Sequence, residues 1–183
     1  MKKIAVFVAL ILTLATGTAF AEINKTISGD DISLGNTWRQ DIKETNQQIF
    51  VTLSRNGYTK TLFGMVRIDT YHYLYISVVS MGQKADNPQN IRFDSKSNPV
   101  FVLVTDKGES TYYFHPATSI STESVSYNPD NASLLPLVQA QRVFLDLPQK
   151  DGKRYRTEIP PDILKEWRDI LTCDLKKELK KGI

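Results

Sequence analysis

A row of tyrosines and two histidines are the residues of this chain whose types could support binding or catalysis. Residues 69–77 read DTYHYLYIS and place Tyr71, Tyr73 and Tyr75 at a spacing of two. Because strand side chains alternate between the two faces of a sheet, the three rings would line one face over about 13 Å, at ~3.4 Å per residue. An exposed row could stack on a sugar, a peptide or an aryl ligand and offer phenol hydroxyls for hydrogen bonds.

The same row could instead be a structural wall, packed under a helix or a second sheet. Tyrosine is a good strand former, and large exposed aromatic patches are uncommon on monomers. The sequence therefore favours a packed tyrosine face, and a binding surface is the alternative. Tyr112 and His115, near the end of another predicted strand, are the next ligand-binding candidates.

His115 is also a weak candidate for a catalytic base. A base needs a nucleophile or a substrate within hydrogen-bond reach. The chain has no G-x-S-x-G, S-x-x-K or H-E-x-x-H motif, no P-loop and no dinucleotide fingerprint. His72 falls on the aliphatic side of its strand, beside Leu74, so we expect it to be a hydrogen-bonded core residue. The sequence leans towards a protein without enzymatic activity, with a small hydrolase that uses His115 as the alternative.

Neither a metal site nor a cofactor site is predicted from the spacing of the ligating residues. The acidic pair Asp30 and Asp31 lacks the glycine and distal glutamate of a calcium loop. Cys173 is the only cysteine, which excludes an internal disulfide and a cysteine-based zinc cluster. We expect its thiol to be at least partly exposed, where it could join two chains.

The N-terminus has the pattern of a bacterial export signal. Lys2 and Lys3 precede an apolar run over residues 4–14, and residues 19–21 (AFA) fit a signal-peptidase site. The run is shorter than the about 20 residues that a membrane span needs. We expect residues 1–21 to be removed, leaving a single domain over residues 22–183 that works in the periplasm or outside the cell.

The charge balance argues against nucleic acid as a partner. The chain has 23 basic and 20 acidic residues, and removal of two signal-peptide lysines would leave 21 and 20. Nucleic-acid binding needs a strong basic surplus on the folded domain. A local surplus lies at the C-terminal end, in Lys176, Lys177, Lys180 and Lys181. At ~1 kcal/mol per lysine near anionic lipid, they predict at most a weak peripheral membrane contact.

The elements that position these residues are predicted to be mostly strands. Residues 48–54 and 59–68 flank Asn56 and Gly57, a dipeptide typical of a type I′ hairpin turn. Residues 100–104 are apolar on both faces and predict a central strand, and residues 142–147 and 154–159 predict a further hairpin. Regular strands at short spacing predict a mainly β (α+β) fold, an antiparallel β-sandwich or a strongly curled sheet.

One amphipathic helix over about residues 161–180 is expected to pack on this sheet. Its stripe at helical spacing consists of Ile163, Leu164, Trp167, Ile170 and Leu171. Docking should loosen after Leu171, where Asp174 and Glu178 enter the stripe.

These observations predict an exported, non-enzymatic binding module of the periplasm or cell envelope, with an unknown protein, peptide or glycan as partner. The alternatives are the hydrolase and a structural envelope protein that dimerises through Cys173.

Overall fold

The computed structural model describes residues 23–63, 65–82, 86–94, 96, 98–114 and 120–180. The predicted signal peptide, His115 and Lys181 lie outside these residues.

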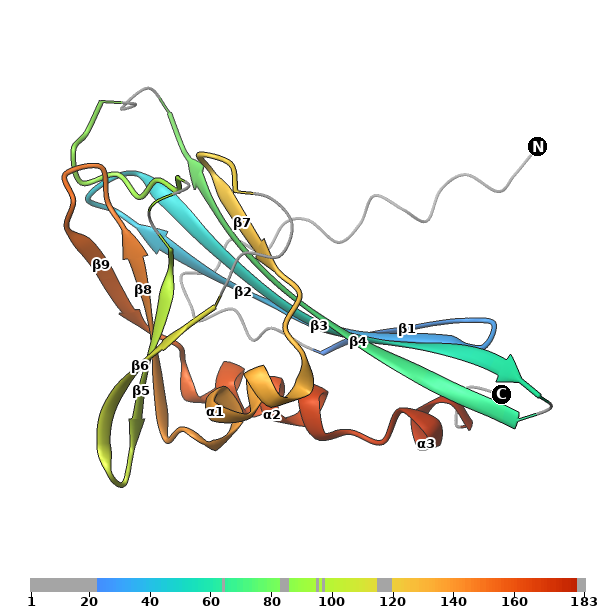
Figure 1. The fold of residues 1–183 in the computed structure, drawn as a ribbon. Coiled ribbons are helices and arrows are strands. Elements are labelled where there is room, and N and C mark those ends of the chain that lie inside the picture. The colour runs from blue at the N-terminus through green and yellow to red at the C-terminus, as the bar shows by residue number, and fades with distance from the viewer. Residues whose placement is uncertain are drawn as a thin grey trace, which may run out of the picture.

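The fold is built from two antiparallel sheets, which confirms the predicted β-sandwich-like architecture with helices (Figure 1). The five-stranded sheet has the order β1-β2-β3-β4-β7 and the four-stranded sheet the order β6-β5-β8-β9. The first consists of β1 (Asn24–Ser28), β2 (Asp31–Ile42), β3 (Gln47–Leu62), β4 (Met65–Ser80) and β7 (Ser124–Tyr127). The second consists of β5 (Val100–Thr105), β6 (Gly108–Tyr113), β8 (Arg142–Pro148) and β9 (Arg154–Glu158).

The main core lies between the two sheets and the helices α1 (Asn131–Gln139) and α2 (Pro161–Thr172). α2 packs on β2 and β3, and Figure 1 shows α1, α2 and α3 (Leu175–Lys180) on the same side of the five-stranded sheet. The main core includes Ile49, Val51, Leu53, Leu74, Ile76, Val78, Phe101, Leu103, Leu134, Leu137, Val143, Leu145, Ile163, Leu164 and Trp167.

The hairpin predicted at Asn56 and Gly57 was wrong, because β3 runs straight through both residues. Asn56 pairs with Ser33 of β2 on one side and with Tyr71 of β4 on the other. Gly57 supplies space and not a turn: a Cβ there would lie 2.9 Å from Leu175 Cδ1 of α3. β3 continues to Leu62, which pairs with Met65 at the start of β4, and Phe63 next to this last pair has a positive φ of 51°.

The single helix predicted over residues 161–180 is divided into α2 and α3. Cys173 has an extended backbone with φ −62° and ψ 149°, and Arg55 of β3 reaches the last carbonyl groups of α2. The guanidinium Nη1 donates to the carbonyl oxygens of Ile170, Leu171 and Cys173 at 3.2, 2.9 and 2.9 Å. Helix ends leave carbonyl groups without intrahelical partners, so this side chain stabilises the break.

The expected loosening after Leu171 was also wrong, because α3 packs on a second apolar cluster. Leu175 and Leu179 are buried against Ile32 and Leu34 of β2. Ile68 of β4 packs on the same cluster. α3 therefore packs on the helix-bearing face of β2, β3 and β4, near the point where β1 ends and β2 begins.

Beyond that point, β3 and β4 continue as a two-stranded arm over residues 58–69. The last pair between β2 and β3 is Ile32–Gly57, whereas β3 and β4 stay paired as far as Leu62–Met65. Five further residues on each strand correspond to about 17 Å at ~3.3 Å per residue. Figure 1 shows this end of β3 and β4 projecting past β1.

Candidate functional site

The tyrosine row lies on the outer face of the five-stranded sheet, opposite to the face that carries the helices. Tyr71 is 39% exposed, and Tyr73 and Tyr75 are half-buried. The alternating His72 and Leu74 point into the core at 2% and 0% exposure. The prediction that the tyrosines pack under a helix or a second sheet was therefore wrong. α2 and the four-stranded sheet cover the aliphatic face of β4, and the tyrosines lie on the opposite face.

Short polar side chains lie next to the tyrosines across β3 and β2. Thr52, Ser54 and Asn56 of β3 are directly opposite Tyr75, Tyr73 and Tyr71. The next row, on β2, is Thr37, Gly35 and Ser33. Together these nine residues form what we call the tyrosine face. Side chains this short cover less of a neighbouring ring than large ones would, and Tyr73 and Tyr75 remain partly exposed.

Two of the three rings are in contact with each other. Tyr73 and Tyr75 stack with centroids 6.2 Å apart and planes inclined by 10°. Beyond the hydroxyl pair of Thr37 and Thr52, whose oxygens are 2.9 Å apart, Phe50 continues the face with the Arg39 guanidinium 6.0 Å from its ring centroid. This arrangement provides π-surfaces, hydroxyl groups and one cation, a set that suits binding by stacking and hydrogen bonds.

Tyr112 belongs to the four-stranded sheet and is engaged inside the protein. Its ring packs edge-on against Phe114 at 5.0 Å, and its hydroxyl donates to the carbonyl oxygen of Ser133 at the start of α1. Burial raises the pKa of this phenol. The structure thus does not bring Tyr112 onto the tyrosine face, and the ligand and base roles of His115 stay predictions.

His72 is buried in the core, as the sequence predicts, but the predicted hydrogen bond is not made by its Nε2 to any residue that the structure describes. Desolvation, helped by the neighbouring Arg55 cation, lowers its pKa to about 4, and Asp130 opposes the shift. Arg55 and His72 face each other across β3 and β4. The imidazole Nε2 has no hydrogen-bond partner within the described part of the chain. A buried neutral imidazole pointing away from the outer face is not placed to act on a ligand there.

Cys173 is half-buried in the link between α2 and α3, which agrees with the expected partial exposure. Its sulfur is 3.9 Å from Arg55 Nη1 and packs against the second apolar cluster. Burial raises the pKa of the thiol, so the reactive thiolate is disfavoured. Chain-to-chain linkage through this residue stays a prediction.

The apolar tip of the arm is a surface that the sequence reasoning missed. Leu62, Phe63, Met65 and Val66 are 52%, 97%, 70% and 66% exposed. The signal was present as LFGMV, a run of apolar residues around a glycine. A turn at Asn56 and Gly57 places residues 59–68 in one strand, so the sequence pattern does not predict a reversal within this run.

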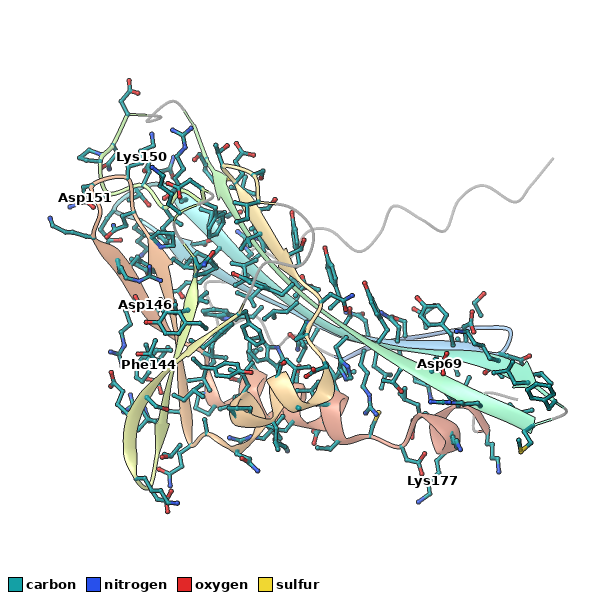
Figure 2. The ribbon with its side chains drawn as sticks, in the orientation of Figure 1. Asp69, Phe144, Asp146, Lys150, Asp151 and Lys177 are labelled. Atoms are coloured by element: carbon teal, nitrogen blue, oxygen red, sulfur yellow. The ribbon has the colours of Figure 1, made fainter. Side chains whose placement is uncertain are left out.

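Charged groups surround the arm on two levels. Near the tip, Lys60 and Arg67 pair with the Asp69 carboxylate at 2.6 and 3.4 Å. Near the base, α3 presents Lys176, Lys177 and Lys180 to solvent. Figure 2 shows Asp69 on the arm and Lys177 pointing away from the strands. The predicted membrane contact of the α3 lysines is compatible with this exposure and stays a prediction.

The opposite end of the molecule carries a polar depression of about 470 Å³ on the four-stranded sheet. Its lining includes Lys153, Arg154 and Asp146. Arg154 already bonds the Asp146 carboxylate at 3.4 Å and the Asn98 carbonyl oxygen at 3.1 Å. This cation is therefore used to hold the loop before β5 against β8.

Within the described ranges, no three His, Cys, Asp or Glu side chains lie together as a metal site. None of the helices among these residues is long and apolar enough to cross a membrane.

Comparison with known proteins returned no match to a family model, to a characterised protein or to a solved structure.

Proposed function

We propose that the protein is an exported, non-enzymatic binding module of the periplasm or cell envelope, and that the tyrosine face holds its partner. The observation that carries this proposal is the position of Tyr71, Tyr73 and Tyr75 on the outer face, beside short polar side chains. A peptide or a glycan chain suits this surface, because both offer flat or extended groups that stack on rings and bond hydroxyls.

The support beneath the rings favours binding by a preformed surface. β3 and β4 are paired over their whole length, and the side chains that alternate with the tyrosines are fully buried, with Leu74 and Ile76 at 0% exposure. Backbone fixed in this way holds the rings in place before a partner arrives, which lowers the entropy lost on binding. Fixing the tyrosine side chains on binding loses little further conformational entropy, because each has only two side-chain torsions.

The test is native mass spectrometry of the protein purified from its own cell envelope. Wild-type protein should carry a bound peptide or glycan mass. The double variant Tyr71→Ser/Tyr75→Ser should lose that mass while keeping its fold, because both side chains lie outside the core. Circular dichroism and thermal unfolding of the variant would verify the fold.

Tyr113→Ser is the matched control, since Tyr113 is 63% exposed but lies on the four-stranded sheet. This variant should keep the bound mass. The proposal would be refuted if wild-type protein were purified with nothing bound. It would also be refuted if the Tyr71→Ser/Tyr75→Ser variant retained the bound mass as well as the Tyr113→Ser control does.

A further inference from the structure

We propose that the apolar tip of the arm inserts into the surface of an anionic lipid bilayer, with Lys60 and Arg67 placed at the lipid headgroups. This surface is separate from the tyrosine face, and the inference does not depend on the proposed function.

The tip combines four apolar side chains at the most projecting point of the two-stranded arm. Phe63 is 97% exposed, and Leu62, Met65 and Val66 are each more than half exposed. An aromatic side chain carries about 150–250 Å² and an aliphatic one about 60–120 Å², so at these exposures the patch reaches roughly 300–450 Å². Exposed apolar patches of this size on a monomer are commonly functional.

The spacing between the tip and its first charges fits the depth of an interfacial anchor. Lys60 and Arg67 are directly opposite each other, two pairs behind Leu62 and Met65. Two residues of strand correspond to about 7 Å at ~3.4 Å each. Interfacial anchors bury their apolar groups roughly 5–10 Å into the boundary between headgroups and acyl chains. With the tip at this depth, both cations lie at the level of the phosphates.

The charges of the arm favour an anionic surface. Lys60 and Arg67 have side chains that are 60% and 76% exposed, and both pair with the Asp69 carboxylate. Ion pairing lowers the pKa of Asp69, so this carboxylate stays ionised and lipid phosphates must compete with it. The exposed lysines of α3 add attraction only over a longer range, because α3 packs at the base of the arm.

The arm is braced and does not depend on the lipid for its shape. α3 packs under its base through Leu175, in the space that Gly57 leaves. Lys25 of β1 and Glu178 of α3 form an ion pair at 2.8 Å. The apolar side chains are thus presented at the end of a supported hairpin, which lowers the entropy cost of insertion.

A lipid surface suits the tip better than a protein partner does. Stable protein interfaces bury about 800 Å² on each side, which is more than this narrow, convex tip offers. The neighbouring edge of β4 carries Arg67 and Asp69, and charges on an edge strand discourage pairing with another strand. A fluid bilayer surface needs neither a large area nor a complementary groove.

The test is flotation of the mature protein with vesicles of phosphatidylcholine and phosphatidylglycerol, compared with vesicles of phosphatidylcholine alone. Wild-type protein should float with the anionic vesicles, and high salt should weaken this binding. The variant Leu62→Ser/Phe63→Ser should bind about tenfold or more weakly, since two large apolar side chains no longer leave water. Tyr113→Ser is the control and should bind like wild type.

Two further variants locate the contact. Phe63→Trp should retain binding, and its fluorescence should shift to shorter wavelength and be quenched by lipids brominated near the headgroup. Lys60→Gln/Arg67→Gln should reduce the preference for anionic over neutral vesicles. Absence of wild-type binding, equal binding by the serine variant, or no tryptophan shift would overturn the inference. It would also be overturned if the serine variant changed the oligomeric state, measured by analytical ultracentrifugation, and left flotation unchanged.

Discussion

Replacement of Arg55 by methionine should destabilise the protein by about 3 kcal/mol. Nη1 is within 3.2, 2.9 and 2.9 Å of three carbonyl oxygens at the end of α2. One guanidinium nitrogen carries only two hydrogens, so the three contacts are equivalent to about two full hydrogen bonds. A bond from a charged donor contributes about 1.5–3 kcal/mol; we take the lower end for each bond, because Arg55 is only partly buried. Methionine keeps most of the apolar stem and removes every donor.

The assay is urea unfolding at neutral pH, followed by tryptophan fluorescence, because Trp38 and Trp167 are both buried at 6% and 1% exposure. The midpoint should fall while the slope of the free energy against urea stays constant, as expected when only stability changes. Arg55→Lys keeps the charge but has no planar fork of donors, so its loss should be intermediate. Arg39→Met is the control, because Arg39 makes only exposed contacts and such pairs contribute about 0–1 kcal/mol. A loss for Arg55→Met no larger than that of the control would refute the capping role.

Two other predictions concern buried positions. The pKa of His72 is about 4 in the folded protein and about 6.5 in the unfolded chain. As the pH is lowered from about 6.5 to 4, the unfolded chain therefore binds a proton that the folded chain does not, and the free energy of unfolding should decrease by up to roughly 3 kcal/mol. The loss should be absent from His72→Phe when urea midpoints are compared across this range, and parallel pH curves would contradict the reasoning. Gly57→Ala should displace α3, because the new Cβ would lie 2.9 Å from Leu175 Cδ1, and overpacking costs about 1–3 kcal/mol. Hydrogen exchange should show lost protection in α3, whereas Gly35→Ala, with its nearest contact at 3.4 Å, should leave α3 protected; equal protection in both variants would contradict the clash.

Alternation of side chains let the sequence separate the two faces of β4 correctly. His72, Leu74, Ile76 and Val78 all point into the core, as period two predicts. The sequence could not tell which face receives the helices, because tyrosines are also large enough to be covered. Which face of β4 is covered depends on β2 and β3, because their buried side chains lie on the same side of the sheet as the aliphatic side chains of β4.

The two wrong element boundaries share a physical cause, since each is decided by a distant part of the chain. Asn56 and Gly57 have the local preference of a turn, but strands on both sides pair with them and Leu175 occupies the space beside Gly57. α2 ends at Thr172 without a glycine cap, because the cap is a side chain from β3. The buried positions of α2 up to Ile170 were nevertheless predicted correctly from helical spacing. Local patterns thus predicted the faces, whereas long-range contacts determine where the elements end.

The same pair of strands carries both proposed surfaces, which fixes their separation. β4 begins at Met65 in the tip and reaches Tyr71 six residues later, about 20 Å away at ~3.4 Å per residue. With Arg67 at the level of the phosphates, Tyr71 follows four residues later, so the nearest part of the tyrosine face would lie about 14 Å from the headgroups at ~3.4 Å per residue. This is beyond the ~8–10 Å over which surface charge acts in physiological salt. A partner on the tyrosine face would be bound without contact with the lipid. Loss of the apolar tip should then leave partner binding unchanged, and loss of Tyr71 and Tyr75 should leave flotation unchanged.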